Sequence, residues 1–194
     1  MLKKFLGAVE SMNAPGFDKT IVLNEKHFHL TLIMLKLLTT EEINRARKVL
    51  ESMSAAIYDC LGTRTLLLTL KGVDVMCDDV DGPEKARSLF ARIVEEDDRL
   101  RKMISELFRG FKEAGLVASD HEEYIKLHAT ILNTRFRKTA NPYAPKVLLD
   151  ARSIVQKFGT FEFGKMRVES LHLSQRFKYD ASGYYHCVKQ LSLP

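Results

Sequence analysis

Two tetrads of the same pattern constrain this chain more than any other feature. The segments 29–32 (His-Leu-Thr-Leu) and 128–131 (His-Ala-Thr-Ile) both have the form His-x-Thr-apolar, and each lies in a run rich in strand-forming residues. Residues i and i+2 of a strand point to the same face of a sheet. Each tetrad therefore places an imidazole and a hydroxyl on one face and two apolar side chains on the other.

The remaining patterns predict both helices and strands. Apolar spacing and capping signals predict helices near residues 2–9, 40–57, 99–111 and 151–158, the second of them opened by a capping box at Thr39. Strand-like runs cover residues 20–23, 28–35, 64–76, 124–136, 160–168, 171–179 and 184–193, whereas residues 85–94 fit either period. The order of elements around each tetrad is alike, which suggests two related halves folded face to face, each with an antiparallel sheet.

Composition sets weaker limits. The chain has 194 residues, of which 45% are hydrophobic, enough for one sizeable core or for two small lobes. Its 30 basic and 25 acidic residues give a formal charge of +5, which allows a polyanionic partner without requiring one. The three scattered cysteines form no C-x-x-C pair, so a reducing compartment fits best. No apolar run is long enough to span a membrane, and we expect no membrane partner.

The doubled tetrad suits acid–base chemistry at a phosphorus centre. An imidazole can accept or donate a proton near neutral pH. With His29 and His128 on opposite sides of a phosphate, one would take a proton from the attacking hydroxyl or water and the other would protonate the leaving oxygen. The hydroxyls of Thr31 and Thr130 would hydrogen-bond the non-bridging oxygens. These four residues are the candidate catalytic residues, and the sequence does not say which histidine is the base.

At this point the chain resembles the 2H phosphoesterase (LigT-like) superfamily, whose signature is a pair of His-x-Ser/Thr-apolar tetrads about a hundred residues apart. The segments 26–35, 126–138 and 171–177 look like a branch that includes a subunit of a nuclear transcription-coactivator complex, and residues 182–187 are similar to the related domain of A-kinase anchoring proteins. The resemblance covers roughly residues 17–194.

The resemblance implies a bilobal α+β fold, with two antiparallel sheets and flanking helices around a central cleft. We expect residues 1–16 to form an N-terminal helix and linker, and residues 17–194 to form the phosphoesterase-like domain. Family members usually have a strand ahead of the first helix. This chain begins nearly at that helix, so we expect the domain to lack that strand or the sequence to begin after it.

The resemblance also implies a function. Members of the superfamily open cyclic phosphodiesters, trim RNA ends, or only bind nucleotides. We therefore expect a metal-independent phosphodiesterase that acts on RNA or nucleotide ligands without a cofactor. By the same resemblance, its partners are the subunits of a helicase-containing coactivator and alkylation-repair complex, in the nucleus, with the cytoplasm as a further compartment. The alternative is a non-catalytic nucleotide- or RNA-binding module of that complex.

Further residues are candidates for substrate binding. Arg135, Phe136 and Arg137 follow the second tetrad and combine cations with an aromatic ring that could stack on a base. A solvated basic strand end is the plainer interpretation. His27 shares a strand face with His29, which allows a metal site, but no third ligand lies at a telling spacing, so we expect no metal and interpret His27 as a rim residue. Arg176 could meet a phosphate or form a structural ion pair.

Overall fold

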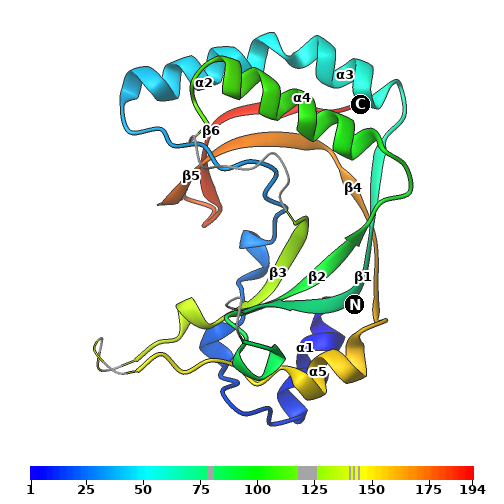
Figure 1. The fold of residues 1–194 in the computed structure, drawn as a ribbon, viewed down its shortest axis with the longest axis vertical. Coiled ribbons are helices and arrows are strands. Elements are labelled where there is room, and N and C mark those ends of the chain that lie inside the picture. The colour runs from blue at the N-terminus through cyan, green and yellow to red at the C-terminus, as the bar shows by residue number, and fades with distance from the viewer. Residues whose placement is uncertain (78–80, 118–125, 140, 142, 144) are drawn as a thin grey trace. The chain divides into compact units, whose positions relative to one another are not determined.

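The computed structural model describes residues 1–77, 81–117, 126–139, 141, 143 and 145–194 of the chain (Figure 1). Within them the α-helices are α1 (Leu2–Ser11), α2 (Thr40–Ser52), α3 (Ser54–Leu61), α4 (Arg99–Glu113) and α5 (Arg152–Phe158). The strands are β1 (Leu66–Met76), β2 (Ser88–Val94), β3 (His128–Asn133), β4 (Glu162–Val168), β5 (Ser170–Tyr179) and β6 (Tyr185–Ser192). The strands form two antiparallel sheets, which confirms the predicted α+β class.

The chain divides into two compact units, each assembled from three segments. Unit 1 comprises Met1–Leu30, Thr69–Val94 and Leu127–Lys165, and unit 2 comprises Thr31–Leu68, Glu95–Lys126 and Met166–Pro194. Two units agree with the predicted bilobal organisation. The expectation that each half of the sequence forms its own unit is wrong, because β2, from the middle of the chain, pairs with the strand of the second tetrad. His128 and Thr130 belong to unit 1, and so does His29, from its N-terminal segment.

The larger sheet has the strand order β3-β2-β1-β4. β2 pairs antiparallel with a strand on either side, and Ala91 lies opposite Val73 of β1 and Ala129 of β3. All three side chains are buried, and they form a continuous apolar row across the sheet. The run 85–94, whose apolar spacing fitted either a helix or a strand, therefore forms a strand over residues 88–94. Pairing with a neighbour on both sides favours the extended form.

The predicted N-terminal helix is α1, and its apolar stripe belongs to the core of unit 1. Phe5 and Val9 are fully buried. The Phe5 ring packs edge-on against Phe158 of α5 and Phe163 of β4, at centroid distances of 5.0 and 5.1 Å. Aromatic pairs in this arrangement contribute attraction beyond the area they bury, so helix and sheet are held together by specific ring contacts.

Unit 2 contains α2, α3 and α4. Thr39 caps α2 as predicted: its hydroxyl accepts the Glu42 N–H, and the Glu42 carboxylate accepts the Thr39 N–H. Gly62 ends α3, also as predicted. α4 buries one stripe of apolar side chains, which is typical of an amphipathic helix lying on a core; they are Leu100, Met103, Ile104, Leu107, Phe108 and Phe111.

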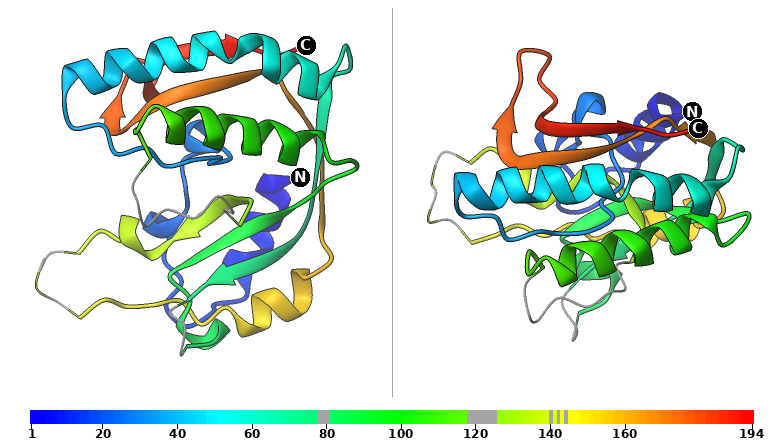
Figure 2. Two further views of the ribbon diagram at one scale, coloured as in Figure 1. Left: turned by 45° about the horizontal axis from the view of Figure 1, so that its top comes forward. Right: turned by 90° about the horizontal axis from the view of Figure 1, so that it is seen from above.

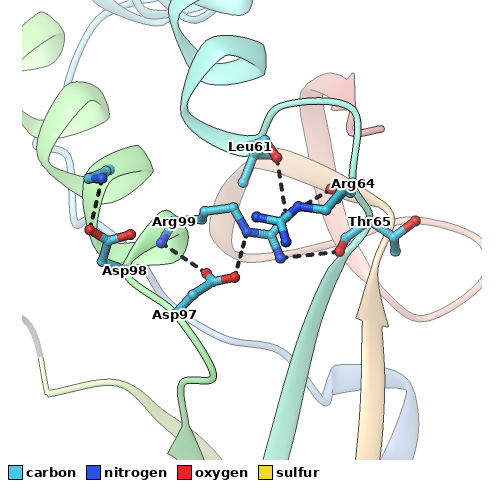
Figure 3. A network of polar contacts seen from close by, with 7 residues as sticks. Leu61, Arg64, Thr65, Asp97, Asp98 and Arg99 are labelled. Carbon is cyan, nitrogen blue, oxygen red and sulfur yellow. Dashed lines mark hydrogen bonds and ion pairs between the residues drawn. The ribbon is translucent and has the colours of Figure 1, made fainter.

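Arg99 fastens the start of α4 to the turn that follows α3 (Figure 3). Its guanidinium donates to the carbonyl oxygens of Leu61 and Arg64 at 3.1 and 3.0 Å, and its Nε donates to the Asp97 carboxylate at 2.7 Å. The carbonyls at the end of a helix lack partners within the helix. Arg99 provides a hydrogen-bond donor to the Leu61 carbonyl at the end of α3 and stays paired with the Asp97 carboxylate.

The second sheet is the hairpin of β5 and β6, drawn in orange and red in Figure 2. Near its open end the pairing is regular, from Ser170 opposite Ser192 to Leu173 opposite Lys189. The register then shifts twice before Tyr179 pairs with Tyr185. The predicted strands 171–179 and 184–193 and the turn between them are confirmed.

Two predicted strands are wrong. Residues 20–23 form a 3₁₀ turn, Lys19–Ile21, followed by a single bridge at Val22, and residues 28–35 are not part of a strand. The cause is local, because the Asn24 side chain accepts the Lys26 N–H and opens a second 3₁₀ turn, Glu25–His27. The chain thereby leaves the edge of β3 just where a longer ladder would begin. Among the described residues, no helix is both long and apolar enough to cross a membrane.

Candidate functional site

The second tetrad lies on β3, at the edge of the larger sheet. Burial alternates along the strand as predicted: His128 and Thr130 are half-buried, whereas Ala129 and Ile131 are buried. Strand geometry therefore holds the imidazole and the hydroxyl on one face while the apolar pair anchors the strand in the core. This part of the predicted local arrangement is confirmed.

Two residues of β2, which the sequence reasoning did not single out, lie directly opposite the second tetrad. Phe90 is the pairing partner of Thr130, and Arg92 is the partner of His128. The buried Phe90 ring packs edge-on against the His128 ring at a centroid distance of 5.3 Å. The Arg92 guanidinium donates to the carbonyl of Gly159. Phe90 thus limits the orientation of the His128 ring, a role visible only once the strand register is known.

The first tetrad begins two residues after the turn Glu25–His27, and its histidine is oriented by the backbone of that turn. Nδ1 of His29 lies 2.6 Å from the carbonyl oxygen of His27. A carbonyl oxygen can only accept, so Nδ1 is the donor and carries a proton. In the neutral ring, Nε2 is then the nitrogen that accepts a proton. His27, predicted as a rim residue, is half-buried and contributes its carbonyl to this bond.

Backbone pairing holds the residues ahead of the first tetrad at the edge of β3, the strand of the second tetrad, within unit 1. Val22 forms an antiparallel bridge with Leu132, and the Leu23 N–H donates to the Ile131 carbonyl at 2.9 Å. In an antiparallel pairing, residues that follow Val22 lie toward the residues that precede Leu132. His29 follows the bridge by seven residues and His128 precedes it by four, but the turn at Asn24 takes the chain off β3 after Leu23, so the proximity of the two histidines stays a prediction from the tetrad pattern.

The two threonines differ in their placement. Thr130 shares a strand face with His128 in unit 1. Thr31 is half-buried and is the first residue of unit 2. A phosphate-binding role for Thr31 stays a prediction from the tetrad pattern.

The basic stretch after the second tetrad is a 3₁₀ turn, Thr134–Phe136, opened by the Asn133 side chain accepting the Arg135 N–H. Arg135 is exposed, and Phe136 is 38% exposed. Both are accessible to a ligand, and their role in substrate binding stays a prediction.

Arg137 has a structural contact as well. Its guanidinium donates to the Gly16 carbonyl and lies near Asp18, whose pKa is lowered mainly by hydrogen bonds from Thr20 and further by the Arg137 charge. Gly16 has φ +78°, and a Cβ there would lie 2.0 Å from the Leu148 carbonyl oxygen, so only glycine fits. The hydrogen bond from Arg137 to Gly16 therefore links the loop after α1 to the turn that follows β3.

Arg176 lies in unit 2, on β5. Its guanidinium carbon is 4.7 Å from the centroid of the Phe177 ring, a cation–π contact with the next residue. Neither of the two interpretations from the sequence, a phosphate contact or an ion pair, is tested by this contact.

The described residues contain no group of three histidine, cysteine, aspartate or glutamate side chains placed to hold a metal ion. The two tetrad histidines of unit 1, His29 and His128, are groups that can transfer protons. His29 carries a proton on Nδ1, and His128 is held against a buried ring beside a half-buried hydroxyl. Imidazoles of this kind act as general acids and bases.

These features define a class of protein: the chain belongs to the family described as the AKAP7 2'5' RNA ligase-like domain, whose model matches residues 1–193. The predicted membership in the 2H phosphoesterase superfamily is confirmed.

Particular relatives agree with this family. The chain is 33% identical over 187 residues to activating signal cointegrator 1 complex subunit 1 of Mus musculus, covering 88% of this chain and 51% of that protein. It is 24% identical over 171 residues to A-kinase anchor protein 7 isoform gamma of Homo sapiens, covering 86% of this chain and 45% of that protein. The chain thus spans about half the length of these curated relatives.

Solved structures show the same fold. The crystal structure of TT0787 of Thermus thermophilus matches with a TM-score of 0.56 at 19% identity, covering 98% of this chain and 92% of that one. A structure titled as a phosphoesterase matches with a TM-score of 0.51 at 15% identity, covering 99% and 91%. At these identities the likeness concerns the fold.

Proposed function

We propose that this 2H phosphoesterase-like module is a metal-independent phosphodiesterase that acts on RNA ends or cyclic nucleotide phosphates. The observation that carries the proposal is the bridge between Val22 and Leu132, which holds the chain seven residues ahead of His29 at the strand of the second tetrad. Family membership supports the same chemistry. The name of the 33% identical relative supports a further proposal, that the chain acts as a subunit of a coactivator complex. The nuclear, helicase-containing and alkylation-repair setting expected from the sequence resemblance is part of this proposal.

In the proposed reaction, His29 and His128 are the two proton-transfer groups. One imidazole takes the proton of the attacking water or hydroxyl while the new P–O bond forms. The other protonates the leaving oxygen as the old P–O bond breaks. The hydroxyl of Thr130 donates to the non-bridging oxygens, which carry the negative charge, and the same role for Thr31 stays an expectation from the tetrad pattern. Arg135 and Phe136 are the accessible groups that would hold the rest of the nucleotide.

Turnover of three RNAs tests the proposal. The protein is incubated with oligonucleotides that end in a 3′-phosphate, a 2′,3′-cyclic phosphate or a plain hydroxyl, and the products are separated. We expect one of them to be converted, and His29→Ala or His128→Ala to slow that conversion by roughly 10²-fold or more. His186→Ala in β6 is the matched control, with turnover as in the wild type.

Chelation is a second arm of this test. EDTA should leave turnover unchanged, because two imidazoles supply both proton transfers. Loss of turnover on chelation, with rescue by one divalent ion, would contradict the proposed mechanism. Saturable nucleotide binding without product from any of the three RNAs would instead establish the binding module considered from the sequence.

A further inference from the structure

The tip of the β5–β6 hairpin, residues 175–185, concentrates aromatic side chains on the surface of unit 2. Four of its eleven residues are aromatic: Phe177, Tyr179, Tyr184 and Tyr185. Phe177 is 60% exposed and Tyr179 is 45% exposed. The ring centroid of Tyr185 lies 5.4 Å from that of Tyr179 and 5.6 Å from that of Tyr184. Figure 2 shows this end of the hairpin extending past the helices of its own unit.

The backbone displaces Phe177 from the regular ladder. Ser174 pairs with Cys187, and the next pair is Tyr179 with Tyr185. Between these two pairs β5 advances by five residues and β6 by two. Phe177 adopts φ +64°, a left-handed conformation that is costly for a bulky side chain. Burial does not offset that cost, because more than half of the residue's surface is exposed. Backbone strain of this kind is typical of functional sites.

Charge adds a second property to the tip. Arg176 and Lys178 flank Phe177, and the Arg176 guanidinium lies over the Phe177 ring. Asp180 is the only acidic residue between positions 175 and 185. Its carboxylate accepts the Ser182 N–H at 2.8 Å, the Ser182 hydroxyl at 2.6 Å and the Tyr184 N–H at 3.2 Å, so it is engaged within the turn. The exposed strand segment is therefore aromatic and cationic.

We propose that the hairpin tip is a stacking platform for single-stranded RNA. Bases stack on Phe177 and Tyr179, and Arg176 and Lys178 contact the phosphates on either side. Exposed rings supply stacking surfaces for the bases of a single strand, and the neighbouring cations supply positive charge for its phosphates. The choice of RNA as the ligand rests on the proposed function, whereas the platform is distinct from the histidines of unit 1.

Fluorescence anisotropy with the whole chain tests this platform. The probe is a labelled oligouridine of about 12 nucleotides, within the site sizes of single-strand binding proteins. The test variant is Phe177→Gly, which removes the ring and relieves the left-handed backbone. We expect its melting temperature to equal or exceed that of the wild type. Its affinity for the RNA should fall roughly 5- to 100-fold, the usual effect of losing one stacked base.

Two further variants make the test specific. Phe177→Asn, which also tolerates positive φ, should lose affinity like Phe177→Gly. Tyr143→Ala removes an aromatic ring that is 93% exposed in unit 1 and should bind like the wild type. Wild-type affinity in both Phe177 variants, or no RNA binding by the wild-type protein, would overturn the inference.

The two proposals can fail separately. If Phe177→Gly loses RNA affinity while His29→Ala and His128→Ala keep full turnover, the platform stands and the phosphodiesterase proposal fails. If Phe177→Gly binds RNA like the wild type while the histidine variants lose turnover, the platform is overturned and the phosphodiesterase stands.

Discussion

Val22 and Leu132 form an antiparallel bridge that holds the chain ahead of the first His-x-Thr tetrad at the edge of the strand that carries the second. One backbone hydrogen bond continues it, from the Leu23 N–H to the Ile131 carbonyl. Residues more than a hundred positions apart are thereby held at one edge of a sheet. The proposed chemistry depends on this short pairing, because the segment around His29 has no strand ladder of its own.

The hydrogen bond made by Leu23 can be removed with proline. Leu23→Pro lacks the N–H that reaches Ile131 at 2.9 Å. We expect an additional loss of about 1–3 kcal/mol in the free energy of unfolding relative to Leu23→Ala, which shortens the side chain but keeps the N–H. Turnover should also fall below that of Leu23→Ala. Equal turnover and equal stability of the two variants, measured by product formation and by urea titration, would show that the pairing does not position His29.

The capping box of α2 predicts a dependence of stability on pH. Hydrogen bonds from the backbone N–H groups of Leu38 and Thr39 lower the pKa of Glu42 below its ordinary value of 4.5. A carboxyl whose pKa is lower in the folded state stabilises the protein above the unfolded pKa and loses this effect as pH falls through the folded pKa. Glu42→Gln should therefore unfold more easily than the wild type near neutral pH, and the difference should shrink below about pH 4.

Urea titrations of both proteins at several pH values measure this difference. Glu41→Gln, one residue earlier in the same helix turn, is the matched control and should show a smaller dependence. A difference between Glu42→Gln and the wild type that stays constant down to acidic pH would contradict the assignment.

The network around Arg99 predicts that its shape matters as well as its charge. A lysine at this position cannot donate to Leu61, Arg64 and Asp97 at once, because its ammonium lacks the planar fork of arginine. We expect Arg99→Lys to lower the free energy of unfolding by about 1–3 kcal/mol. Lys102→Ala, which removes an exposed ion pair with Asp98, should cost less than about 1 kcal/mol. If thermal denaturation finds Lys102→Ala less stable than Arg99→Lys, the importance assigned to the shape of the Arg99 side chain is wrong.

Patterns within a single segment predicted the structure well. The capping box of Thr39 and Glu42 and the alternation along His128–Ile131 both appear as expected, because their cause lies in a few neighbouring residues. The segment 28–35 has the same strand-forming composition, yet a strand also needs a partner, and the turn at Asn24 moves the chain away from β3. Partners across strands, such as Phe90 beside His128, depend on register and could not be seen in the sequence.

The division into units shows the same limit. Matching element orders around the two tetrads suggested two sequence halves, whereas both histidines belong to unit 1, together with β2 from the middle of the chain. Long-range packing decides which strands pair, and the residue pattern within one segment does not determine that choice. The family resemblance supplied the superfamily, which the periodicity alone left open.

The most direct measurement of the central claim is an NMR titration of the histidine ring protons with inorganic phosphate, with His29 and His128 assigned by substitution. If both imidazoles flank one anion, their resonances shift together and give the same dissociation constant, while the His186 resonance stays in place. A response from only one of the two, or two different dissociation constants, would contradict a shared site.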